Sequence, residues 1–147
     1  MSAAPHTLPT TSPNLAGAAR AGATSAGVAI AANLAVLGVA TLAGADMVVR
    51  QSASQPAMHI SSLLVTVTIL VPVLAGTLLL IPARRWGARG WLALAAAGLA
   101  LGVLSVVMPL AMEAEPGTRL ALASMHVISG VSWFLVVRRA ATRFWDV

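Results

Sequence analysis

The chain has 147 residues, of which 59% are hydrophobic and only 9% are charged, and its formal net charge is +5. A soluble domain carries about 25% charged residues. A chain of this length with so few charges could not cover its surface with polar groups, so a lipid bilayer is the expected solvent for most of it. The basic residues stand beside apolar runs without interleaved stacking aromatics, which argues against nucleic-acid binding. The absence of cysteine excludes disulfides, thiolate metal sites and cysteine nucleophiles.

The N-terminal segment, residues 1–19, is rich in Ser, Thr, Pro and Ala, with prolines at positions 5, 9 and 13. Such a composition buries no core, and we predict a disordered cytoplasmic tail. We do not expect a secretory signal peptide, because the apolar stretch that follows is too long and lacks a short basic leader.

Four apolar stretches follow, at about 22–49, 58–81, 90–111 and 119–137. Each reaches the roughly 20 residues that a helix needs to cross the hydrocarbon core, and none has a charge at its centre. The backbone must satisfy its own hydrogen bonds in lipid, which favours helices. Short links make sequential helices antiparallel neighbours. The sequence therefore predicts an all-α polytopic membrane protein, with an up-down bundle of four transmembrane helices within residues 20–138.

The arginines predict how this bundle is oriented. All of them except Arg50 and Arg119 fall on one side of the predicted spans. Arginine-rich loops face the cytoplasm, so both termini are expected inside a bacterial cytoplasmic (inner) membrane that the chain crosses several times. Residues 139–147 form a short basic and aromatic cytoplasmic tail in this prediction, with Phe144 and Trp145 resting on the membrane surface.

Several residues within the spans predict how the helices pack. Gly98 and Gly102 have the GxxxG spacing that lets two helices approach closely, and Asn33 is an amide suited to bridge two helices in lipid. Pro72 lies in the middle of the second span, where it removes a backbone hydrogen bond and is expected to kink the helix.

The predicted outer face holds the one concentration of ionisable groups. Asp46 and Arg50 would lie one helical turn apart and pair. All the groups belong to the same end of a bundle and are therefore candidates to form one polar or functional cluster. Its members are Asp46, Arg50, His59, Glu113, Arg119 and His126.

His126 is the most informative member, because an ionisable side chain inside a membrane is a functional candidate by default. It would bind a ligand, pass a proton or hold a metal, or it would serve structure through a hydrogen bond to Ser129, Ser105 or Asn33. No HxxxH or ExxH spacing is present, so neither a metal nor a cofactor is predicted.

The run that opens the fourth span, from Thr118 to Gly130 after Pro109-Leu110, carries a resemblance. Its sharpest part is TRLALxxMH. It resembles a family of small four-span membrane proteins from high-GC Gram-positive bacteria that is catalogued as a domain of unknown function. The resemblance covers the spans and implies that Arg119 and His126 recur, but it implies no activity.

No phosphate-binding loop, dinucleotide fingerprint or nucleophile motif appears in the sequence. The leading interpretation is a non-enzymatic integral membrane protein, a small subunit or helper that packs against lipids, a membrane-protein partner or further copies of itself. The alternative is a small oligomeric transporter or channel subunit that uses Pro72 and the outer-face cluster. A third, a membrane enzyme or metal-dependent redox protein, would rest on His59 and His126.

Overall fold

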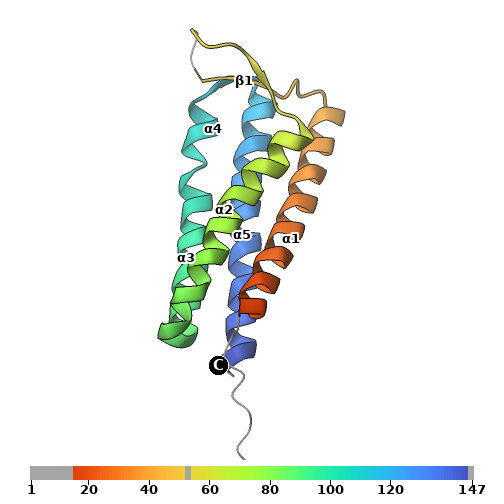
Figure 1. The fold of residues 1–147 in the computed structure, drawn as a ribbon. Coiled ribbons are helices and arrows are strands. Elements are labelled where there is room, and N and C mark those ends of the chain that lie inside the picture. Colours follow the sequence, from red (N-terminus) through yellow and green to blue (C-terminus); the bar gives the residue numbers. More distant parts are fainter. Residues whose placement is uncertain (1–14, 52–53, 146–147) are drawn as a thin grey trace, which may run out of the picture.

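The computed structural model describes residues 15–51 and 54–145 of the chain. Helices run side by side along most of the molecule, and a small sheet lies across one end (Figure 1). The helices are α1 (Leu15–Leu42), α2 (Ser62–Ala83), the 3-10 turn η1 (Arg84–Trp86), α3 (Gly87–Leu104), α4 (Val107–Ala111) and α5 (Pro116–Trp145). The strands are β1 (Val48–Arg50), β2 (Met58–His59) and β3 (Glu113–Ala114).

Three helical segments are long and apolar enough to cross a membrane: Leu15–Leu42, Ser62–Ala111 and Pro116–Trp145. The second of these contains α2, η1, α3 and α4, and the chain turns back on itself at η1 (Figure 1). The predictions of a helical fold and of helices suited to a membrane are confirmed.

The first predicted span, 22–49, is wrong at its end, because α1 stops at Leu42. Gly44 has φ +92°, and its amide and that of Ala45 donate to the carbonyls of Thr41 and Ala40 at 3.1 and 3.0 Å. These two bonds form the glycine-terminated end that many helices use to satisfy their last carbonyls. The chain then leaves the helix and forms strand β1, so Asp46 and Arg50 are not one helical turn apart.

The second and third spans also differ from their predicted limits. The predicted start at Met58 falls in β2, and α2 begins after Ser61, whose hydroxyl accepts from the Leu64 amide at 3.2 Å. The predicted third span, 90–111, is interrupted at residues 105–106, between α3 and α4. Pro109 lies four residues after Ser105, where its ring opposes a continuous helical hydrogen bond.

The helix at the fourth predicted span is longer than predicted, and both predicted tails are shorter than predicted. Helix α5 starts at Pro116, and it continues to Trp145 through most of the predicted tail 139–147. Phe144 and Trp145 pack edge-on against Trp91, with ring centroids 5.7 and 5.6 Å away, and do not lie free on a surface. Residues 15–19 of the predicted N-terminal tail are helical as well, and residues 1–14 lie outside the described part of the chain.

Small side chains make up much of the interior. The buried face of α1 consists of Gly, Ala, Ser and Asn at helical spacing, against α2 and α5. The backbones of α3 and α5 meet where a Cβ on Gly102 would stand 2.7 Å from the Cα of Gly130. Trp133 of α5 lies against Gly76 of α2 and Gly98 of α3, and its indole N–H donates to the Leu94 carbonyl at 3.0 Å.

The contact at Gly102 gives a first prediction. Gly102→Ala places a Cβ against backbone atoms that have no free rotation, 2.7 Å from Gly130 Cα and 2.8 Å from the His126 carbonyl oxygen. We expect it to lower the free energy of unfolding by about 1–3 kcal/mol, as overpacking does. Denaturation in detergent micelles, followed by tryptophan fluorescence, measures the change.

The matched control is Gly38→Ala in α1, where an added Cβ meets no atom within 4 Å. This change is expected to be neutral or to stabilise by up to about 1 kcal/mol, because alanine favours helix more than glycine does. Equal effects of the two substitutions would contradict the proposed close contact.

Candidate functional site

The sheet at the end of the helices joins the two connections on that side. β1 is its central strand and pairs antiparallel with β2 and with β3. Val48 lies opposite His59, and Arg50 lies opposite Glu113. The strands bring four members of the predicted outer-face cluster, Asp46, Arg50, His59 and Glu113, onto or beside one sheet that the sequence analysis did not predict.

Asp46 and Thr118 form the best-defined polar contact at this end. The Thr118 hydroxyl donates to Asp46 Oδ1 at 2.9 Å and accepts from the Met47 amide at 3.1 Å. The Val48 amide also donates to Asp46 Oδ1, at 3.1 Å, and the Asp46 amide donates to Glu115 Oε2 at 3.2 Å. Thr118 and the Met47 side chain are fully buried, so these bonds attach the segment after α1 to the first turn of α5.

The same bonds stabilise the ionised form of the Asp46 carboxyl. Donation from the Val48 amide and the Thr118 hydroxyl holds the pKa of the Asp46 carboxyl below its usual value, and the charge of nearby His59 contributes in the same direction. The carboxylate that accepts both bonds therefore keeps its charge to a lower pH than an ordinary aspartate does.

Two residues of this contact were missed by the sequence analysis. Met47 has a left-handed backbone, with φ 52°, and lies buried beneath the sheet. This conformation is uncommon outside glycine and asparagine, and a methionine gives no signal for it. The sequence signal for the Thr118 contact is weak. It consists only in the fact that a threonine in the first turn of a helix has a hydroxyl free to bond to another segment.

Arg119 and His126 lie on α5, outside the sheet. The Nε of Arg119 is buried and has no hydrogen-bond partner in the described part of the chain. His126 stands two turns, or about 10 Å, further along α5. Its Nδ1 is 2.8 Å from the Leu122 carbonyl of its own helix, so its hydrogen bond is not to Ser129, Ser105 or Asn33 as predicted. The structure thus brings part of the predicted cluster together and leaves His126 apart from it.

The described residues contain no group of three His, Asp or Glu side chains placed to share a metal ion. His59 is exposed on β2, whereas His126 is half-buried on α5. The two histidines therefore lie on separate elements.

The residues predicted to mediate helix packing occupy the helix interfaces. The Asn33 amide donates to the Ala29 carbonyl at 2.7 Å and to Ser129 Oγ at 3.1 Å, which connects α1 with α5. Gly98 and Gly102 both face α5. Pro72 is exposed on α2, which remains helical across it, so the proline faces away from the other helices.

A protein-family model described as a family of unknown function (DUF6069) matches residues 13–143. No curated protein and no solved structure matches the chain. The match covers the helices and the sheet together, and it supplies no activity.

The Thr118 contact gives a second prediction. Thr118→Val keeps the shape of the side chain but leaves the buried Met47 amide without its acceptor, so we expect a loss of about 1–3 kcal/mol in unfolding free energy. Thr142→Val is the control, because that hydroxyl bonds only to the Arg139 carbonyl of its own helix. Hydrogen exchange of the β1 amides should accelerate in the first variant and not in the second; unchanged exchange would contradict the contact.

Proposed function

Because the chain belongs to the DUF6069 family, whose function is unknown, we propose from its own residues that it is a non-enzymatic integral membrane protein. We further propose that it acts as a small subunit or helper that packs against other membrane proteins or lipids in the bacterial cytoplasmic membrane.

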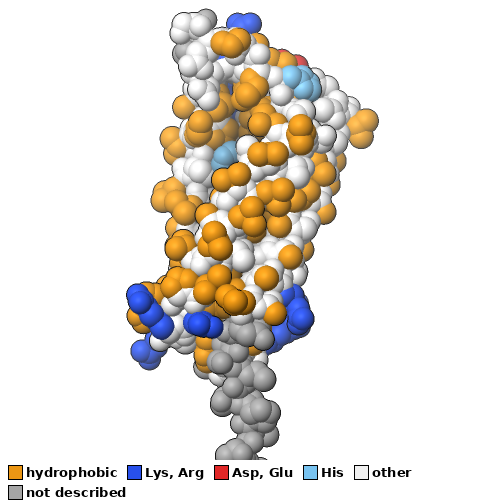
Figure 2. Space-filling view, in the orientation of Figure 1, with side chains coloured by type: hydrophobic (Ala, Val, Ile, Leu, Met, Phe, Trp, Pro, Cys, Tyr) orange, Lys and Arg blue, Asp and Glu red, His pale blue; other side chains and the backbone are white. Residues whose placement is uncertain are grey.

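The observation that carries the proposal is the apolar outer surface. Large aliphatic side chains face outward along α2, α3, α4 and α5, and many are more than half exposed. Figure 2 shows such side chains over most of one face, with arginines gathered at one end. Extensive exposed apolar surface is unfavourable in water, so this surface fits a lipid environment. The exposed aliphatic side chains on α2 include Leu63, Val71, Leu74 and Leu78.

The lengths of α2 and α3 fit four membrane crossings better than three. The Trp91 indole donates to the Leu80 carbonyl at 3.0 Å, which brings the ends of α2 and α3 together around η1. With 22 residues, α2 is about 33 Å long, and α3 with 18 residues is about 27 Å long. Each is close to the roughly 30 Å of a hydrocarbon core. We therefore propose that α1, α2, α3 and α5 each cross the membrane once.

The arginines support an orientation for these crossings. The start of α1, the η1 turn with the start of α3, and the end of α5 lie at one end of the molecule (Figure 1), and they carry every arginine except Arg50 and Arg119. Under the positive-inside rule this end is cytoplasmic, which places both termini inside.

The outward face of α1 supports a role in packing against another helix. Between Ala16 and Gly38 its one large exposed aliphatic residue is Val28. Ala23, Gly27, Ala31 and Ala35 are exposed at a spacing of four, and an added Cβ on Gly27 meets nothing within 4 Å. Small residues at this spacing let a second helix approach closely in lipid.

The alternative, a transporter or channel subunit, gains no support from the described residues. Pro72 lies on the outer surface of α2, and His126 is separated from the sheet. The pathway in this alternative would form between copies of the chain, so the alternative stays a prediction.

Cysteine accessibility tests the proposed topology, and the native chain contains no cysteine to interfere. Ala57→Cys, beside β2, should react with a membrane-impermeant maleimide on intact cells. Ala19→Cys, beside Arg20 at the other end, should react only after the cells are permeabilised. Both sites are exposed in the structure. Labelling of both sites on intact cells would contradict the orientation.

Native mass spectrometry of the protein, extracted gently from its own membranes, tests the helper role. We expect a reproducible mass that exceeds the 14.9 kDa of one chain by the mass of at least one further polypeptide. Gly27→Leu should abolish the added mass because it obstructs close approach to α1, whereas Ala75→Leu adds bulk to the exposed face of α2 and should not. A bare monomer in the native protein would overturn the proposal.

A further inference from the structure

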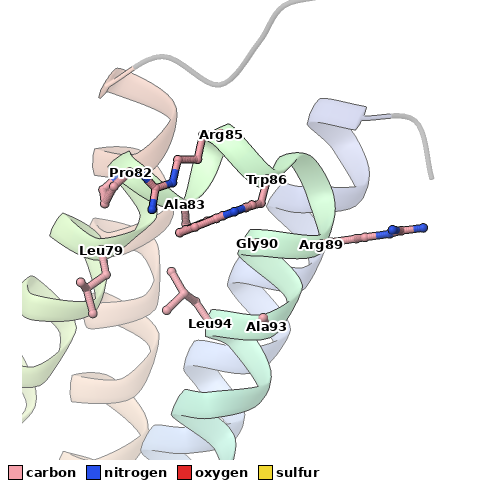
Figure 3. Close-up of a pocket in the computed structure, with 9 residues that line it drawn as sticks. All are labelled: Leu79, Pro82, Ala83, Arg85, Trp86, Arg89, Gly90, Ala93 and Leu94. Carbon is pink, nitrogen blue, oxygen red and sulfur yellow. The ribbon is translucent and has the colours of Figure 1, made fainter.

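A groove of about 690 Å³ opens at the arginine-rich end, between the end of α2, the η1 turn and the start of α3. A water molecule occupies roughly 30 Å³ in the liquid, and binding sites for small molecules occupy about 300–1,000 Å³. The groove is therefore large enough for part of an organic molecule. It is open on one side (Figure 3) and shares no residue with the sheet or the Asp46 contact.

The walls of the groove are fixed by contacts beneath it. Trp91 is buried and donates to the Leu80 carbonyl, and Gly90 lies so close to the Ala83 carbonyl that a Cβ there would clash. The Arg84 amide also donates to carbonyls of the last turn of α2. The turn therefore has little freedom to collapse and fill the groove.

The floor is apolar and the rim is cationic. Leu79 of α2 and Leu94 of α3 line the space between the two helices, as Figure 3 shows. The Arg85 guanidinium lies 3.9 Å over the ring of Trp86 and reaches back across the groove, whereas the exposed Arg89 extends away from it. Tryptophan at this position is typical of the headgroup level of a membrane.

Within residues 15–51 and 54–145, no carboxylate lies near this rim to neutralise its charge. The acidic residues in the described part of the chain are Asp46, Glu113 and Glu115, and all three lie at the sheet end. Arginine binds phosphate through several parallel N–H donors. A ligand that matches both parts of the groove carries a phosphate with net negative charge and an aliphatic chain.

We propose that this groove binds one anionic phospholipid of the cytoplasmic leaflet, with the phosphate against Arg85 and an acyl chain between Leu79 and Leu94. The proposal rests on the membrane insertion and orientation proposed above. It adds a defined lipid site to a surface that would otherwise contact bulk lipid. Arg89 contributes its charge to the rim without direct contact.

Lipid retention by the purified full chain in detergent tests the headgroup contact. Native mass spectrometry compares phosphatidylglycerol with phosphatidylcholine of identical acyl chains. We expect one phosphatidylglycerol to be retained in preference, and Arg85→Gln to lower that retention about fivefold, because the phosphate loses a charged hydrogen-bond donor that contacts it directly. Arg84→Gln removes the same charge one residue outside the groove, without a direct contact, and should change retention less than about twofold. Equal losses in both variants, or no preference in the native chain, would overturn the proposal.

Filling the groove tests the acyl-chain contact. Ala93→Leu adds bulk to the lining and should reduce retention of both lipids, whereas Ala100→Leu, at an exposed position on α3 outside the groove, should not. Full retention by Ala93→Leu would show that the lipid lies elsewhere. Each variant is also labelled at Ala57→Cys, so that normal labelling with lost lipid preference identifies failure of the site and not of membrane insertion.

Discussion

The contact between the backbones of α3 and α5 at Gly102 and Gly130 determines how the other helices are placed. Because no side chain separates the two helices there, Trp133 can reach across to Gly98 and to Gly76 of α2. Helix α5 thereby contacts α3 directly, α2 through an indole ring, and α1 through the bond between Ser129 and Asn33. One helix organises the other three, and its small residues make that possible.

The distribution of residue sizes separates the inside of the molecule from the outside. Alanine, glycine and serine fill the buried face of α1, whereas leucine and valine face outward on α2 and α3. In lipid, aliphatic side chains gain nothing from burial against protein, so close packing and hydrogen bonds must hold the helices together. The same surface gives the proposed helper role and the proposed lipid groove their physical basis.

Length and hydrophobicity predicted helices in the regions of α2 and α3, and the structure has helices there. The sequence analysis failed where a few residues determine where a helix ends or which segments pair. Gly44 signals the end of α1, yet within an apolar run it looked like any other glycine. The strands contain two or three residues each and have no periodicity of their own, so their pairing follows from where the helices place the loops. For the same reason, the sequence analysis named Asp46 but not its hydrogen-bond partner Thr118, which spacing does not indicate.

The sheet also makes the two ends of the molecule mechanically unequal. β1 is hydrogen-bonded on both sides, so the connection after α1, the start of α2 and the start of α5 are tied by backbone. At the arginine-rich end, the described contacts between α1 and α5 include Phe144 against Gly17, and no strand joins the helices in the described part of the chain. If α1 separates from its neighbours, the sheet favours opening from its N-terminal end, so the gap would lie at the arginine-rich end of the molecule.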